Sequence, residues 1–254
     1  MTDQIRGLAD LRPGDIMFAP IGGLVPGVFP VGLGQLALGE VFRVGRLSVR
    51  HVGIVVEASE HLPPGSSQNL RTKQWHAGSL LPEAMPFGGE FQNYPTGVIT
   101  APRLVQAMPG GAEEIELRIG THWTPRHAYL RLPEDYPGQA ENAALLAREM
   151  IGTPYSFASY AALAAYRFGI RSGHLERWIN RRRAPTFMNR HNTATPGWGI
   201  KYALPREAIC SVLVDQAWTL AGKDVMPNTA EQAVTPGALA NQLWRTPGAI
   251  WGLP

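Results

Sequence analysis

Cysteine is almost absent from this chain. The 254 residues contain one, Cys210, so no disulfide can form within the chain. The cysteine usage therefore gives no indication of an oxidising compartment. Lysine is also scarce, since only 3 of the 23 basic residues are lysine, and the formal net charge is +3. So small a charge excludes nucleic acid as the default partner.

An uninterrupted apolar run is also lacking. Residues 16–39 carry no charge over 24 positions, which is long enough to span a membrane. However, Pro20, Pro26, Pro30 and six glycines would break a helix repeatedly there. We therefore expect no transmembrane helix, but an apolar loop that folds over the core or lines a groove.

The first residues, 1–6, lead into no apolar core of a signal peptide. This predicts a protein that is cytoplasmic as synthesised, unless another machine delivers it to the cell wall. The preference for arginine over lysine would suit a high-GC bacterium or its phage.

The pattern along the chain favours a single domain, 1–254, with an insertion at about 169–199 that is rich in arginine. We expect helices at 139–151, at 158–168 and after Thr235, which looks like an N-cap with proline at the first helical position. Strands are expected at the end of 11–18 and at 50–58, 72–77, 97–102, 113–119 and 128–132.

The single cysteine begins the most informative stretch, 208–218. Leu213, Val214 and Ala217 follow Cys210 by three, four and seven residues, which is the spacing of one helical face. A helix is therefore predicted, with Gly222 as its stop. A thiol in a first helical turn is easier to ionise and could serve as a nucleophile. The alternative is that Cys210 is simply a small buried apolar residue.

A cysteine nucleophile needs a base, and the base needs an orienting group. Of seven histidines, only His51 and His76 fall at the edges of convincing strands. His122 and His127 flank what looks like a hairpin turn. No two histidines have helical i, i+4 spacing, so neither a metal site nor a cofactor is expected.

Four motifs together resemble one enzyme family. They are Pro-Gly-Asp-Ile-Met-Phe from Pro13, His-Val-Gly-Ile-Val-Val-Glu-Ala from His51, Gly-Thr-Pro-Tyr-Ser-Phe from Gly152 and Ile-Cys-Ser-Val-Leu-Val from Ile209. In this order they are similar to the permuted branch of the NlpC-type papain-like thiol hydrolases, which includes YiiX-like proteins and, more distantly, lecithin:retinol acyltransferases. The resemblance covers roughly 11–58, 75–84 and 139–222. It implies an α+β papain-like fold, an antiparallel sheet packed against the helix that bears the cysteine.

The resemblance also implies roles for individual residues. Cys210 would be the nucleophile, His51 the base and His76 the orienting third residue. Tyr155 matches a tyrosine beside the active site, and Asp15 matches the aspartate of a Gly-Asp motif and is expected to be structural. Ser211, next to the nucleophile, is grouped with the residues that line the site.

Glu57 is the main competitor of His76 for orienting the base. It shares a strand face with His51 but lies six residues away, which is about 20 Å at ~3.3 Å per residue. His76, on a separate strand, can lie directly opposite His51. We therefore expect His76 to orient His51.

These residues predict a cysteine peptidase or amidase that cleaves a peptide amide, with cell-wall peptide as the usual substrate of the family. Two alternatives stay open: an acyltransferase or thioesterase acting on a lipid-like substrate, and a catalytically silent binding or assembly module. The arginine-rich insertion either binds an anionic polymer or membrane surface, or is a solvated excursion. Binding would involve Arg181, Arg182 and Arg183.

Overall fold

The computed structural model describes residues 4–20, 42–44, 47–49, 51–59, 100–156, 186–188, 202–204, 207–227 and 234–253. Their centre is a six-stranded antiparallel sheet of order β10-β7-β1-β4-β5-β6. Its strands are β1 Ile16–Ala19, β4 His51–Glu57, β5 Arg103–Met108, β6 Gly111–Glu116, β7 Ala128–Arg131 and β10 Ile250–Gly252. Two small two-stranded sheets pair β2 Phe42–Val44 with β3 Leu47–Val49, and β8 Thr186–Met188 with β9 Tyr202–Leu204. A short 3-10 helix, Leu8–Asp10, precedes β1.

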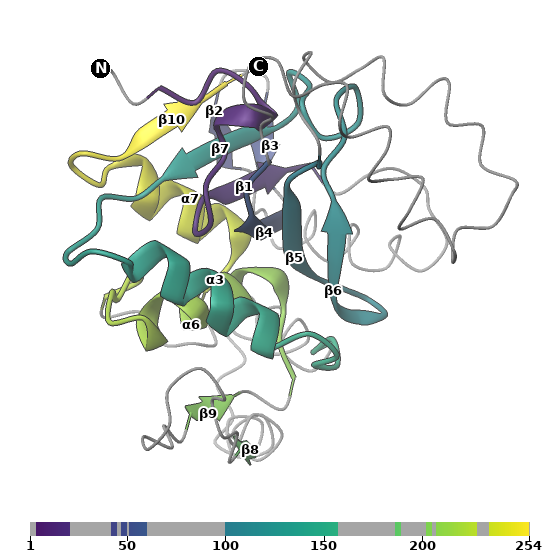
Figure 1. Cartoon of the computed structure of the whole chain (residues 1–254), viewed down its shortest axis with the longest axis vertical. Coiled ribbons are helices and arrows are strands. Elements are labelled where there is room, and N and C mark those ends of the chain that lie inside the picture. Colours follow the sequence, from purple (N-terminus) through teal and green to yellow (C-terminus); the bar gives the residue numbers. More distant parts are fainter. Residues whose placement is uncertain are drawn as a thin grey trace, which may run out of the picture.

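Three α-helices are described: α3 Gln139–Glu149, α6 Cys210–Leu220 and α7 Pro236–Trp244. Helices α3 and α6 pack on each other and on β4 (Figure 1). Gly152 and Gly222, each with a φ of 85°, follow α3 and α6 in a left-handed conformation that favours glycine. Thr235 caps α7, because its side chain accepts a hydrogen bond from the Ala238 N–H. The fold is therefore α+β, as predicted, with the cysteine at the start of a helix that packs on the sheet.

The central strand β4 is buried on both faces, and its alternation divides the core in two. Val52, Ile54 and Val56 belong to one cluster together with α3, α6 and α7. Val55 belongs to a second cluster on the other face, with Met17 and Ala19 of β1 and the N-terminal segment. We call these the helix face and the N-terminal face of the sheet.

The expected strand at 97–102 is wrong where the structure describes it. Residues 100–102 are not in a strand, and β5 begins at Arg103. Strand β6 lies two residues earlier than expected at its start and ends at Glu116. Between them, Pro109 and Gly110 form the two-residue connection that sets the register Met108↔Gly111. This turn was the available sequence signal for the pair of strands.

Several predictions fall outside the described residues. These are the strand at 72–77, the helix at 158–168, most of the uncharged segment 16–39 and the arginine-rich insertion apart from β8. No helix in the described part of the chain is long and apolar enough to cross a membrane.

Candidate functional site

Cys210 is the first residue of α6 and is buried, with 1% of its surface exposed. Leu213, Val214 and Ala217 are buried with it, which confirms the predicted helical face. Ile209, before it, has an extended backbone and gives no side-chain cap to the helix. The thiol therefore lies in the first turn, where the N–H groups of a helix lack intrahelical partners.

Tyr155 lies beside the segment that enters α6. The Ala208 N–H donates to the Pro154 carbonyl over 3.0 Å, and the Ser156 N–H donates to the Ala208 carbonyl over 3.1 Å. Tyr155 and Ala208 thus form a parallel bridge two residues before the thiol. Tyr155 is therefore adjacent in the fold to the segment that leads into Cys210.

The same segment ties the start of α6 to one end of the sheet. The Ala112 N–H donates to the Thr153 carbonyl over 2.8 Å, and Ala112 opposes Ala107 in β5. Gln106, the residue before Ala107, opposes Gly53 in β4. Ala112, Ala107 and the first residues of β4 therefore lie side by side across the sheet. Cys210 and the start of β4 are therefore at the same end of the sheet.

His51, the first residue of β4, is buried and opposes Ala19 of β1. Its ring Nε2 lies 2.7 Å from Gln106 Oε1. The two residues are diagonal neighbours on β4 and β5, and Gly53 lies between them without a side chain. A Cβ at Gly53 would also come within 2.7 Å of the Leu104 side chain, so the close approach requires glycine.

Glu113 fixes the orientation of the Gln106 amide. Gln106 Nε2 donates to Glu113 Oε1 over 3.1 Å, so the amide oxygen is the atom that faces His51. An amide oxygen only accepts, and His51 Nε2 must therefore carry the hydrogen. In the neutral ring Nδ1 then holds the lone pair. Burial lowers the pKa of His51, while the bond to Gln106 opposes that shift, so the ring is neutral near pH 7.

Two further histidines lie on the same side. His127 is the last residue of the β6–β7 connection, and its Nδ1 is 2.9 Å from the Thr124 hydroxyl. His122 Nδ1 accepts from the Arg118 N–H over 2.9 Å, and the two rings are 6.3 Å apart. Burial, with smaller contributions from His122 and His51, lowers the pKa of His127 to about 4.

His51 and Cys210 belong to different faces of the sheet. Cys210 belongs to the helix-face cluster with Val52 and Ile54. His51 has the opposite strand parity, and it opposes Ala19 of the N-terminal-face cluster and bonds to Gln106. The two residues predicted as nucleophile and base therefore lie at the same end of the sheet but on opposite faces.

Asp15 and Ser211 have structural partners. Asp15 forms a two-point ion pair with Arg131, through Nε at 2.9 Å and Nη2 at 2.7 Å, and it also accepts from the Arg12 N–H. Burial raises the pKa of Asp15, and the arginine opposes that shift. Ser211 is fully buried, and its hydroxyl donates to the Val234 carbonyl over 2.6 Å. Ser211 therefore holds α6 against the segment that carries Val234, and it does not line an open site.

The orienting role assigned to His76 falls outside the described residues. The expectation that Glu57 does not orient His51 agrees with the structure, because Glu57 ion-pairs with Arg148 at the far end of β4. Gln106 is the residue that sequence reasoning missed. Its signal was a single polar side chain, Gln106, within the apolar run Leu104–Ala107.

The described residues contain no group of three or more side chains arranged to hold a metal ion. Comparison with known proteins found no matching family model, no similar curated protein and no similar solved structure.

Proposed function

We propose that the protein is a thiol hydrolase on a papain-like fold, with Cys210 as nucleophile and His51 as general base. The observation that carries the proposal is the chain of hydrogen bonds from His51 through Gln106 to Glu113. A general base must be neutral before it accepts a proton, and its lone pair must point to a known place. Burial and the fixed amide supply both conditions at His51 Nδ1.

The proposed reaction begins with transfer of the Cys210 thiol proton to His51 Nδ1. The thiolate attacks an amide carbonyl, and the Cys210 N–H at the start of α6 helps to bind the oxyanion. His51 then protonates the leaving amine, which leaves an acyl group on Cys210. Water, deprotonated by His51, hydrolyses this acyl-enzyme and restores the thiol.

The opposite faces of the two residues impose a conformational step on this mechanism. Because His51 is the first residue of β4 and α6 starts at the same end of the sheet, the path between them runs around the strand end. Nδ1 must therefore move toward the sulfur before proton transfer, and substrate binding would drive that motion. Gln106 holds the resting orientation.

The substrate proposed first is a peptide amide, in line with the resemblance to cell-wall peptidases. Acyl transfer or thioester hydrolysis on a lipid-like substrate uses the same acyl-enzyme and differs only in the donor and acceptor. Panels of amides, esters and thioesters, with intact-mass detection of an adduct, separate these substrates. The adduct must be absent in Cys210→Ala.

The test of the dyad is the pH dependence of Cys210 acylation by a substrate of the panel, because substrate binding is what brings His51 to the thiol. We expect the parent protein to react at a pH below the ~8.5 midpoint of a free thiol. His51→Ala should shift the pH midpoint of the reaction upward. His122→Gln, which replaces a histidine outside the hydrogen-bond chain, should leave that midpoint unchanged. Identical profiles for the parent and His51→Ala would refute the assignment of His51 as the base.

A catalytically silent binding or assembly module is the second candidate. The observation that favours it is the burial of Cys210 on the face opposite His51. A buried structural thiol reacts slowly at neutral pH, and its rate would not depend on His51. Slow alkylation together with no acyl adduct from any substrate would select this reading.

A further inference from the structure

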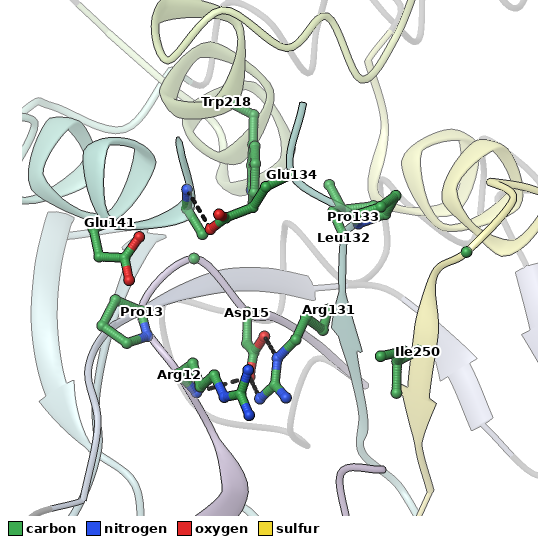
Figure 2. Close-up of a pocket in the computed structure, with 13 residues that line it drawn as sticks. Arg12, Pro13, Asp15, Arg131, Leu132, Pro133, Glu134, Glu141, Trp218 and Ile250 are labelled. Carbon is green, nitrogen blue, oxygen red and sulfur yellow. Dashed lines mark hydrogen bonds and ion pairs between the residues drawn. The ribbon is translucent and has the colours of Figure 1, made fainter. Parts of the chain in front are cut away.

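A cavity of about 390 Å³ opens at the other end of the sheet. It lies among the turn before β1, the β7–α3 connection and α6, and Figure 2 shows the side chains around it. Its volume falls in the range of about 300–1,000 Å³ that is usual for small-molecule sites. Gly14 helps to close it, because its backbone contacts Ala140 so closely that a Cβ would lie 2.6 Å away.

One side of the cavity carries a fixed cation. Arg131 Nε and Nη2 bind Asp15, and Nη2 also donates to the Asp10 carbonyl over 2.6 Å. These bonds use three of the five guanidinium hydrogens. The two Nη1 hydrogens have no partner within the described ranges. Arg131 thus offers Nη1 as an unused edge in a set orientation, where a carboxylate oxygen can accept a charge-assisted hydrogen bond.

Another side of the cavity carries two carboxylates, Glu134 and Glu141, apart from Arg131 in the view of Figure 2. Glu134 uses Oε1 to accept from the Ala140 N–H over 3.1 Å. Glu141, in the first turn of α3, has neither a hydrogen bond nor an ion pair among the residues that the structure describes.

Trp218 adds an unpaired donor. This residue of α6 lines the cavity and is fully buried, and its Nε1 lacks a hydrogen-bond partner in the described structure. Buried indole N–H groups usually have a partner, so this one calls for an explanation.

We propose that this cavity binds a small zwitterion, namely an amino acid or a short peptide with free ends. Its carboxylate would meet the Nη1 edge of Arg131, and its ammonium group would lie against Glu134 and Glu141. A ligand with a single charged group would leave either the Arg131 side or the carboxylate side of the cavity without a charged partner. Trp218 lies eight residues beyond Cys210, which is about 12 Å along the helix, so the site is separate from the thiol. The proposal does not rest on the proposed hydrolase activity.

Calorimetric titration tests the proposal with three matched probes: L-alanyl-L-alanine, its N-acetyl derivative and its C-terminal amide. We expect the free dipeptide to bind, and each blocked probe to bind at least about tenfold more weakly, since one charged contact is lost. Glu141→Gln should weaken the free dipeptide by about tenfold and leave the N-acetyl probe unchanged. Glu116→Gln, which removes an exposed carboxylate of β6, should change neither.

Cys210→Ala should bind the dipeptide as the parent does, whether or not the parent is a hydrolase. Equal affinities for the three probes, or no binding at millimolar dipeptide, would overturn the proposal. So would a loss of binding in Cys210→Ala, because that result would place the ligand at the thiol.

Discussion

Replacing Gln106 with leucine tests the hydrogen-bond chain that holds His51. The side chain keeps a similar size but loses the oxygen that lies 2.7 Å from His51 Nε2. The buried Nε2–H then has no acceptor, which costs about 1–3 kcal/mol. Glu113 also loses a donor, but it is exposed, so water replaces the bond at little cost. We therefore expect Gln106→Leu to lower the free energy of unfolding by about 1–3 kcal/mol.

The effect should be the same at any pH above about 6.5, because His51 is neutral there in both proteins. The bond to Gln106 raises the pKa of His51 against the effect of burial, so its loss moves that pKa further down and keeps the ring neutral.

Urea unfolding at pH 7.5 measures the stability change, and ¹⁵N chemical shifts of the imidazole report the tautomer of His51. Gln242→Leu, on the exposed surface of α7, is the matched control and should change stability by less than about 0.5 kcal/mol. We expect the parent to show a protonated Nε2 and a bare Nδ1. A parent ring with the hydrogen on Nδ1, or a Gln106→Leu protein as stable as the control, would refute the reasoning.

Two further predictions concern stability. Asp15→Ala should lower the free energy of unfolding by about 3–5 kcal/mol, because it leaves the Arg131 side chain, 12% exposed, without its counter-charge. An unchanged thermal midpoint would contradict this. Acid should also destabilise the protein: burial lowers the pKa values of His51, His122 and His127, so the unfolded chain binds more protons below pH 6.5. The free energy of unfolding should be constant above pH 6.5 and fall between pH 6.5 and about 4, where His127 titrates. In urea unfolding, His127→Gln should make this fall with pH less steep. An equal slope in that variant would exclude His127 as a source.

Local patterns in the sequence were sufficient to predict α6 and β4. The spacing of Leu213, Val214 and Ala217 after Cys210 depends only on the helical repeat, and the β-branched run after His51 depends only on strand propensity. The relation between the two elements could not be predicted in the same way. Both faces of β4 are apolar, so the alternation does not say which face meets the helix.

That choice is made by pairing with β1 and β5, and His51 is 55 residues from Gln106 in the sequence. A shift of one residue in either register would turn His51 to the other face. The resemblance predicted that His76 orients His51. Gln106 lies in β5, which begins six residues after the start of the strand expected at 97–102.

The contact between Ile5 and Gly252 has a consequence for the order of elements along the chain. Ile5 packs so closely on Gly252 that a Cβ at residue 252 would lie 2.6 Å from the Ile5 Cβ. A short linker could therefore join these two positions into a closed ring. Cutting that ring between β4 and α6 would give a circular permutant in which the thiol helix is translated before the histidine strand, while every strand keeps its neighbours. The order of cysteine and histidine in the gene is then set by the position of the cut, and the geometry between them is independent of it.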